Sequence, residues 1–441
     1  MNFFIQTFGC QMNESDSSQI ASLLRGAGYN PADRAEEADL IAVNTCCVRQ
    51  SAENRALGYI GSLKGLKAQK PDLIIAVCGC MAQKEGAAAD FLRRYRHVGL
   101  ILGTFALARL PEYIAAYRDR GEVIVDVAEN PPQTTDLPAP CAKDGYKAQV
   151  NIIYGCDNFC AYCIVPYVRG RERSRAPQQI LAEVRALAQA GVKEVQLLGQ
   201  NVNAYGKDLT GEGWDFARLL SELDSMEGLA RIRYMTSHPR DFTLKLAETI
   251  ARSRHICQHF HLPLQSGCDR ILAAMHRGYD TAYYSRLLEM VRALAPEATI
   301  TSDLIVGFPG ETDDDFQQTL DFVSECQFDA AYTFLYSQRS GTPAAALPLQ
   351  VAAEVKKQRL QTLMARQNPI SLERNKRLIG SKQVILVEGI SKNDPAQWYG
   401  RTDGNKITVF APHSKNDLKP GEMLALQISG AQTWNLQGEC V

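Results

Sequence analysis

The sequence predicts an α/β protein in three parts: an N-terminal doubly wound parallel sheet, a central partial (β/α)6 TIM-like barrel and a small C-terminal all-β barrel. The first reason is length, because 441 residues are about three domains of ordinary size. The second is that short apolar runs alternate with helical periods, which is typical of parallel strands joined by right-handed crossovers. The third is that from residue 381 onward short β-type runs separated by Gly, Pro and Asn replace this alternation and favour a small barrel.

Four apolar runs, each followed by a helical period, predict the N-terminal sheet. The expected strands cover residues 3–8, 39–44, 72–77 and 98–102. The expected helices cover residues 15–27, 52–68, 83–96 and 105–117. Residues 130–140 (NPPQTTDLPAP) carry four prolines and neither period. We therefore expect residues 1–118 to form the first domain and residues 119–141 to be a linker.

Six further strand candidates, with a helical period between each pair, predict the central barrel. They cover residues 149–154, 194–198, 231–235, 257–262, 299–306 and 329–335. Six β/α units over about 190 residues are too few for a closed eight-stranded barrel of about 250 residues, so an open, partial barrel is expected. Helical patterns over 351–368 and 371–378 lead out of it. The expected domains are residues 142–372 for this barrel and 373–441 for the last one.

Charge and hydropathy limit the partners of the chain. The 48 Lys and Arg nearly balance the 49 Asp and Glu, so any nucleic-acid surface must be a local patch. No apolar run reaches the roughly 18 residues that a membrane span needs, and the N-terminus lacks the pattern of a secretory signal. We therefore expect a cytoplasmic protein that binds no membrane. Its 13 cysteines then point to metal or redox chemistry, because cytosolic thiols are kept reduced.

Cys156, Cys160 and Cys163, here termed the loop triad, form a C-x3-C-x2-C pattern directly after the first strand of the predicted barrel. Three thiolates on one loop can each hold one iron of a cubane 4Fe–4S cluster, which leaves the fourth iron open. A zinc site is the alternative, but zinc favours paired C-x2-C knuckles and a closed fourth ligand. Barrel active sites are built at this end of the strands, so the pattern predicts a catalytic iron–sulfur cluster.

Cys10, Cys46 and Cys80, here termed the strand triad, each follow one of the first three predicted strands. In an open α/β sheet the carboxyl ends of the strands share one edge, where ligands bind, so these thiols are expected to converge. The alternative is that each is a buried apolar cysteine, the usual fate of an isolated Cys. Cys47 and Cys78 are expected in the core, because alternation along a strand turns Cys78 away from Cys80.

The loop triad, with an aromatic residue just before its last cysteine, resembles the radical S-adenosylmethionine (SAM) superfamily. Further motifs over nearly the whole chain are similar to those of the methylthiotransferase family within it. These motifs are TFGCQMNESDS, NTCCVRQSAENRA, CGCMAQ, GCDNFCAYCIVPYVRGRERSR, LLGQNVNAYG, SHP, HLPLQSGCDRIL, DLIVGFPGET and YSQRSGTPA. The first and fourth are most similar to those of the methylthiotransferases that modify prenylated tRNA adenosine.

The resemblance implies two 4Fe–4S clusters, a radical cluster on the loop triad and an auxiliary cluster on the strand triad, together with SAM. It implies methylthiolation of C2 of N6-dimethylallyladenosine at position 37 of tRNAs that read codons beginning with U. No acid–base pair is expected, because that C–H is not acidic. The residues implied to contact SAM are Tyr162, Gly199, Gln200, Asn201, Ser302 and Asp303. A helix cap at the strand end is an equally good interpretation of the last two.

The partner implied is a tRNA anticodon stem-loop, because the C-terminal part resembles the TRAM domain, a small RNA-binding module. The cations expected to hold its phosphates are Arg169, Arg171, Arg173, Arg175, Arg374, Lys376 and Arg377. The candidates for stacking on bases are Trp398, Tyr399 and Trp434. The alternative is that the aromatic residues are barrel core and the basic helix is a solvated face. A monomer served by an external electron donor and a sulfur carrier is expected.

Two other functions stay open at this point. The same chemistry on threonylcarbamoyl-adenosine tRNA, or on a ribosomal protein side chain, needs the same two cysteine triads. An iron–sulfur protein that binds RNA and catalyses no reaction would also need the two cysteine triads, but it would not cleave SAM.

Overall fold

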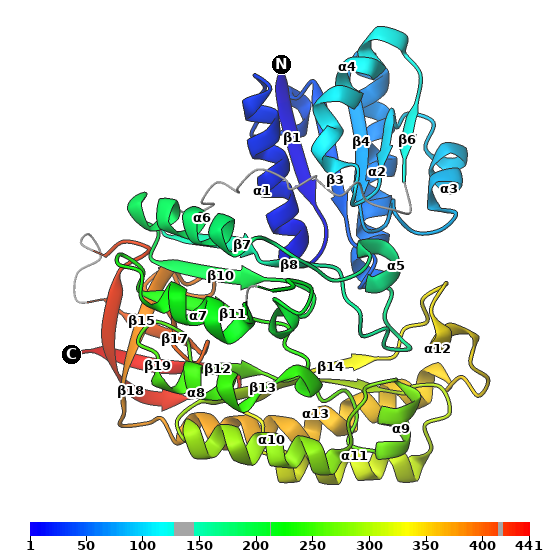
Figure 1. Ribbon diagram of the computed structural model, residues 1–441. Helices are drawn as coiled ribbons and strands as arrows, with labels where there is room; N and C mark the ends of the chain where they lie inside the picture. Colours follow the sequence, from blue (N-terminus) through cyan, green and yellow to red (C-terminus); the bar gives the residue numbers. More distant parts are fainter. Residues whose placement is uncertain (128–144, 212, 413–417) are drawn as a thin grey trace.

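The computed structural model describes residues 1–127, 145–211, 213–412 and 418–441, which form three units (Figure 1). The N-terminal unit, blue to cyan, stands above the central unit, and the C-terminal barrel, orange to red, lies at one side of it. The predicted three-part α/β architecture is confirmed. The proline-rich residues 130–140 lie outside the described residues. No described helix is long and apolar enough to cross a membrane.

Six parallel strands in the order β2-β1-β3-β4-β5-β6 form the N-terminal sheet. The strands are β1 (Asn2–Thr7), β2 (Asn30–Pro31), β3 (Leu40–Thr45), β4 (Ile74–Gly79), β5 (Leu100–Leu102) and β6 (Ile124–Asp126). The helices are α2 (Gln50–Gln69) and α3 (Ala87–Arg94) on one face and α1 (Gln11–Gly26) and α4 (Leu110–Arg120) on the other. Strands β3 and β4 are buried along their whole length because both faces are covered, as in other parallel sheets.

The two edge strands of this sheet differ from the expectation. Strands β2 and β6 have only two and three residues, so neither shows a period in the sequence. Strand β6 pairs with β5 inside the stretch 119–141 that was expected to be linker. That expectation is wrong at its start, because the N-terminal sheet continues as far as Asp126.

The central unit contains six parallel strands in two groups, ordered β7-β10-β11 and β12-β13-β14. A bridge between Ile232 and Ile256 joins the groups, which confirms a six-stranded partial barrel. The strands are β7 (Lys147–Asn151), β10 (Glu194–Leu198), β11 (Arg231–Tyr234), β12 (His259–His261), β13 (Thr299–Val306) and β14 (Ala330–Leu335). The longer helices are α6 (Pro177–Gln189), α7 (Phe216–Asp224), α8 (Leu244–Arg252), α10 (Thr281–Leu294), α11 (Asp313–Cys326) and α13 (Ala353–Lys376). Shorter elements are β8 (Ile153–Tyr154), β9 (Arg173–Ser174), α5 (Val165–Arg169), α9 (Asp269–Ala274) and α12 (Pro343–Ala346).

Helix α13 replaces the two helices expected over 351–368 and 371–378. It runs through Pro369, although a proline inside a helix costs about 3 kcal/mol. Leu363 and Ser371, on either side of the proline, are both fully buried. Burial on both sides of Pro369 therefore keeps the helix continuous.

The C-terminal unit is a closed five-stranded barrel ordered β15-β16-β17-β19-β18, as predicted. The strands are β15 (Lys382–Ile390), β16 (Trp398–Thr402), β17 (Ile407–Ala411), β18 (Met423–Ala431) and β19 (Asn435–Cys440). Arg231 and Arg233, near the start of β11, donate hydrogen bonds of 2.6–2.9 Å to four backbone carbonyls of this barrel. The barrel therefore docks at the amino ends of the central strands, which leaves their carboxyl ends for the N-terminal unit.

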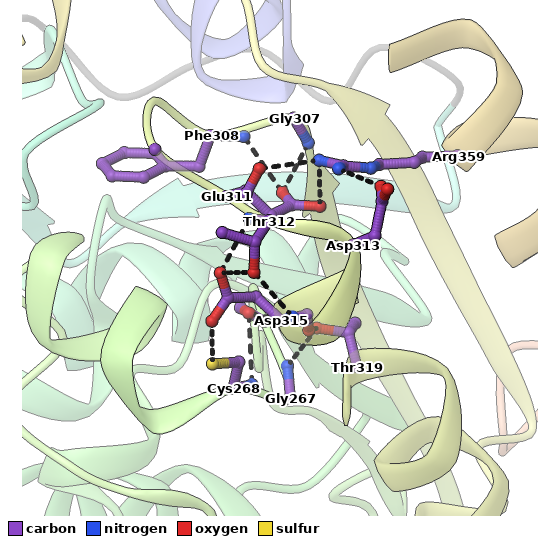
Figure 2. Close-up of polar contacts among 12 residues, drawn as sticks. Gly267, Cys268, Gly307, Phe308, Glu311, Thr312, Asp313, Asp315, Thr319 and Arg359 are labelled. Atoms are coloured by element: carbon purple, nitrogen blue, oxygen red, sulfur yellow. Dashed lines mark hydrogen bonds and ion pairs between the residues drawn. The ribbon is translucent and has the colours of Figure 1, made fainter. Parts of the chain in front are cut away.

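The loop after β13 is held by a buried polar network (Figure 2). The Glu311 carboxylate accepts hydrogen bonds from the backbone N–H groups of Gly307 (2.6 Å) and Phe308 (3.1 Å). Arg359 of α13 donates to the same carboxylate at 3.2 Å. Thr312 caps α11 in a capping box with Asp315. This part of the DLIVGFPGET motif therefore fixes the carboxyl end of β13 against two helices.

Candidate functional site

The loop triad lies between β8 and α5, on the segment that crosses the carboxyl end of the first barrel strand. Gly155 has φ +72°, and a Cβ there would overlap the carbonyl oxygen of Arg171, so the turn into the loop requires glycine. Cys156 and Cys160 are buried and Cys163 is half-buried. Burial raises the pKa of the Cys156 thiol to about 11 and that of Cys163 to about 12. A metal that takes these sulfurs as thiolates would supply the missing positive charge.

The strand triad comes together as predicted, because β1, β3 and β4 are neighbours in the sheet and each cysteine follows one of them. A hydrogen bond from the Cys46 thiol lowers the pKa of Cys10 to about 6. Gly79 has φ +93°, and a Cβ there would overlap the Asn44 side chain and the backbone of Thr45. The chain therefore turns at the end of β4 only because residue 79 is glycine, and this turn brings Cys80 to the same edge.

Cys47 and Cys78 occupy the core, as predicted, on different faces of the sheet. Cys78 packs with the α1 and α4 side. Cys47 packs with the α2 side, where its thiol hydrogen bonds to Cys80 and lowers the pKa of Cys80. Cys268 is buried and donates a 3.1 Å hydrogen bond to Asp315 (Figure 2).

Both triads fit a cubane by their donor chemistry. Each supplies three thiols, and thiolates hold a cubane at separate iron atoms rather than at one point. Among the residues that the structure describes, no three His, Cys, Asp or Glu side chains converge closely enough for a single metal ion. Each triad also receives a buried guanidinium: Arg277 donates to Cys160 at 3.3 Å and Arg169 donates to Cys80 at 3.2 Å. Such N–H donors stabilise a sulfur that carries negative charge.

A cavity of about 570 Å³ lies at the carboxyl ends of the barrel strands. Cys163 of the loop triad lines it, and so do residues 48–51, which follow Cys46 and Cys47 in the N-terminal unit. Its apolar wall includes Phe334 and Leu335 of β14. Thr236 and Gln265 also line it and hold φ of 69° and 75°, a conformation that non-glycine residues adopt uncommonly. The cavity therefore joins the loop triad to the segment that follows Cys46 of the strand triad.

Only some of the residues implied to contact SAM lie where a ligand could reach them. Tyr162 and Asp303 line the cavity. The Oε1 of Gln200 is buried and accepts no hydrogen bond from the described residues, so it has an acceptor to offer. The Asn201 amide donates to Asp241 at 2.8 Å, and its oxygen accepts from the backbone N–H of His238 at 3.1 Å.

Gly199 and Ser302 have structural roles instead. A Cβ at Gly199 would overlap the Ile153 side chain, so this glycine permits close packing. The Ser302 hydroxyl is fully buried, donates to the carbonyl of Leu262 and accepts from the N–H of Leu264, both at 2.9 Å. The expectation that Ser302 binds a ribose hydroxyl is wrong, because both functions of its hydroxyl are used between β12 and β13.

The four arginines of the RGRERSR run do not form one surface. Arg171 is exposed, pairs with Asp157 at 3.2 Å and lies over the Phe159 ring, and Arg173 lies half-buried over Tyr154. Arg169 and Arg175 are buried. The expectation that these two hold phosphates is wrong, because their guanidinium groups are enclosed and pair with Asp16 and Glu183, respectively.

The candidates for RNA contact near the C-terminus also differ in exposure. Arg374 pairs with Asp329 at 3.2 Å where the barrel docks, whereas Lys376 and Arg377 are exposed. Trp398 is 8% exposed and belongs to the barrel core, so its expected stacking role is wrong. Tyr399 is half-buried, whereas Trp434 is 58% exposed, so of the three aromatic candidates Trp434 presents its ring at the surface.

Sequence reasoning missed the groups that position the triads. Asn13 lies one turn after Cys10, is fully buried and donates to the Thr45 carbonyl at 3.0 Å. Arg339 reaches from the central unit to the Val48 carbonyl at 2.6 Å. Arg277 also escaped notice, since a single arginine far along the chain gives no pattern. Asn13 had a signal, because it falls inside the TFGCQMN motif beside a predicted ligand.

Three families match consecutive parts of the chain. Residues 2–103 match "Uncharacterized protein family UPF0004", residues 150–323 match "Radical SAM superfamily" and residues 376–441 match "TRAM domain". Two curated relatives, from Pelotomaculum thermopropionicum and Moorella thermoacetica, are each 50% identical and are both named tRNA-2-methylthio-N(6)-dimethylallyladenosine synthase. The first alignment covers 98% of this chain and 96% of the relative, and the second covers 100% and 98%.

Solved structures show a similar fold at low identity. The radical SAM methyltransferase TsrM from Kitasatospora setae has a TM-score of 0.58 at 13% identity and covers 78% of this chain and 77% of its own. The cobalamin-dependent radical SAM enzyme OxsB has a TM-score of 0.54 at 14% identity and covers 84% of this chain and 57% of its own. At this identity the likeness concerns the fold alone.

Proposed function

The chain belongs to the family of tRNA-2-methylthio-N(6)-dimethylallyladenosine synthases, which are radical SAM methylthiotransferases, and on that premise we propose how its residues perform that reaction. The substrate is N6-dimethylallyladenosine at position 37 of tRNAs that read codons beginning with U, and the product carries a methylthio group at C2. The observation that carries the proposal is one cavity that Cys163 lines from one unit and residues 48–51 line from the other.

The protein binds two 4Fe–4S clusters and SAM. The loop triad would hold the radical cluster and the strand triad the auxiliary cluster, because each offers three thiols to a cubane that keeps one iron open. When bound, these groups supply the radical that removes hydrogen from an unactivated carbon and the sulfur that replaces it. The substrate C2–H is not acidic, so the chain's own residues need to bind, orient and exclude water rather than transfer protons.

The cavity residues account for that binding. Phe334, Leu335 and Ile305 offer apolar surface to the prenyl group, which gains free energy by leaving water. Tyr162 and Asp303 bind SAM beside Cys163, and the unused oxygen of Gln200 accepts a hydrogen bond from its methionine end. A substrate bound against the apolar wall of the cavity also limits the access of water to a carbon radical.

The tRNA contact is assigned to four cations on two units, of which three are exposed and Arg173 is half-buried. Arg171 and Arg173 lie on the segment that follows the loop triad, and Lys376 and Arg377 lie where α13 leads into the C-terminal barrel. Trp434 supplies a stacking surface. We assign residues 1–126, which include the edge strand β6, to the domain of the strand triad, residues 142–372 to the radical SAM core and residues 373–441 to the RNA-binding barrel. The protein acts in the cytoplasm as a monomer, with an external electron donor and sulfur carrier.

The test is nucleoside analysis of tRNA by mass spectrometry in cells that lack the protein. The methylthio-prenyladenosine is expected to disappear while its prenyladenosine precursor accumulates. Wild-type protein and a Cys440→Ala variant, which alters a thiol of the C-terminal barrel, should restore the product, and Cys46→Ala should not. An unchanged level of the methylthio nucleoside would contradict the proposal, and loss of a methylthio-threonylcarbamoyl nucleoside instead would assign the alternative substrate.

A further inference from the structure

Arg169 occupies a position between the two triads that the proposed function does not explain. It is the last residue of α5, and its side chain is 8% exposed although it crosses from the central unit into the N-terminal one. Its Nη2 donates to Asp16 Oδ2 at 2.7 Å, and its Nε donates to Cys80 Sγ at 3.2 Å. The side chain therefore ends on a sulfur of the strand triad.

The backbone beside Arg169 contacts the other triad. The N–H of Cys156 donates to the carbonyl of Gly170 at 3.1 Å. Gly170 has φ +74°, which turns the chain back toward the loop at this point. Two consecutive residues therefore connect the triads, since Gly170 accepts from Cys156 through its backbone and Arg169 donates to Cys80 through its side chain.

Asp16 fixes the orientation of the guanidinium. Its side chain is 3% exposed and lies in α1, one turn beyond Asn13. A guanidinium is a rigid planar fork, so a carboxylate on Nη2 determines where the Nε–H points. The ion pair is enclosed, and removal of Arg169 alone would leave a buried carboxylate without its cation.

The hydrogen bond to sulfur has a predictable effect on a cluster held there. Reduction potentials of iron–sulfur clusters depend on net charge, on solvent exposure and on hydrogen bonds to the sulfurs. An N–H directed at a thiolate stabilises the extra electron of the reduced cluster and so raises its potential. Arg277 gives the loop triad a comparable donor at Cys160, but its other hydrogen bonds, to Tyr162, Pro263 and Tyr279, stay within the central unit.

We propose that Arg169 is a positioning residue that sets the potential of the auxiliary cluster and aligns it with the radical loop. The inference rests on the proposed function, because it needs a cluster on the strand triad. Arg169 reaches Cys80 only when the central unit docks on the N-terminal one, so the auxiliary cluster has its working potential only in the docked protein.

The test measures the midpoint potential of the auxiliary cluster alone, by redox titration followed by electron paramagnetic resonance. The full chain carries Cys156→Ala, Cys160→Ala and Cys163→Ala, so that only the strand triad binds a cluster. In this background Arg169→Lys is expected to lower the equilibrium constant for reduction about tenfold, which is about 59 mV for one electron. Lysine keeps the charge beside Asp16, but its single ammonium cannot also hold the position of the Nε–H.

A double variant, Asp16→Asn with Arg169→Gln, repeats the test without a buried unpaired charge and covers the case in which Arg169→Lys does not fold. Its potential should fall in the same direction. The matched control is Arg339→Lys, since Arg339 also joins the two units but contacts Val48 and Gln50 rather than a triad thiol. Its potential should equal that of the background.

Three results would overturn the inference. The first is an unchanged potential in both Arg169 variants. The second is an equal fall in Arg339→Lys, because a variant that leaves the hydrogen bond from Arg169 to Cys80 intact would then lower the potential as much as its loss. The third is a background protein that retains Arg169 and binds no cubane on the strand triad; that result would overturn the proposed function as well.

Discussion

The two cysteine triads are built in different ways. The loop triad lies within eight consecutive residues, 156–163, on one turn between β8 and α5, so the chain needs little more than its local conformation to present three thiols. The strand triad draws one cysteine from the end of each of three neighbouring strands, so it exists only when the N-terminal sheet is folded. One protein can therefore hold two similar clusters that depend on tertiary structure to different degrees. A substitution at one triad should then remove the cluster of that triad and leave the other cluster in place.

The largest effects are expected from the cysteines themselves. Cys160→Ala should abolish both SAM cleavage and thiolation, because the radical cluster is needed for either. Cys46→Ala should retain cleavage to 5′-deoxyadenosine and lose thiolation. Chromatography with mass spectrometry of both products, after anaerobic reconstitution with reductant, gives the answer. If Cys46→Ala also lost cleavage, the separation of the two triads would not hold.

Two glycines test how each triad is positioned. Gly79→Ala should remove the auxiliary cluster alone, because the new Cβ overlaps Asn44 and the backbone of Thr45 at the end of β4. Gly155→Ala should remove the radical cluster alone, because its Cβ overlaps the Arg171 carbonyl. Iron analysis should give about four atoms per chain in each variant and about eight in the wild type. Gly58→Ala is the control, because a Cβ at Gly58 in α2 meets no atom within 4 Å. A variant of Gly79 or Gly155 with full iron would show that the turn tolerates a side chain.

The interface between the units should matter more to the strand triad. Arg339→Met removes a buried cation that donates to Val48 and Gln50 and lies 3.8 Å from Glu53, and it should cost about 3 kcal/mol of unfolding free energy. Thiolation should fall more than SAM cleavage, since cleavage needs only the central unit. Arg252→Met, in an exposed pair with Glu248, should cost less than about 1 kcal/mol. Denaturant unfolding and product ratios measure both effects, and equal losses in the two variants would contradict the account.

The smallest effects concern two asparagines. Asn13→Ala removes two buried hydrogen bonds, which the Asn13 amide donates to the Thr45 carbonyl at 3.0 Å and to Asn44 Oδ1 at 3.2 Å, and should cost about 1–3 kcal/mol of unfolding free energy. Asn158→Ala removes a 3.4 Å contact to Cys156 on a half-buried loop and should cost less. Denaturant titration of the two variants compares them directly. A larger loss from Asn158→Ala would mean that the loop triad depends on its surroundings more than the strand triad does.

The same difference explains how much could be predicted from the sequence. The spacing of Cys156, Cys160 and Cys163 is visible in the chain and predicts a cluster directly. The strand triad became visible only through topology, since Cys10, Cys46 and Cys80 share nothing but their place after strands. The fold class could be predicted from the alternation of apolar runs and helical periods. Strands β2 and β6 could not be predicted, because two or three residues are too few to show a hydrophobic period.

The errors have a common physical origin in burial. Arginines at positions 169, 171, 173 and 175 look alike in the sequence, but the chain turns at Gly170 and encloses the first and last. Trp398 and Tyr399 are adjacent in β16, and the period of two places the first inside the barrel. A run of like residues therefore predicts a surface only where its spacing matches the exposed side of the element that carries it.

The most direct measurement is the iron content and electron paramagnetic resonance of two triple variants, one with alanine at all three positions of the loop triad and one with alanine at all three of the strand triad. Each is expected to retain one reducible cubane, and added SAM should change only the signal of the variant that keeps the loop triad. Full iron in the variant without Cys10, Cys46 and Cys80, or no cubane in the variant without the loop triad, would contradict two separate cluster sites.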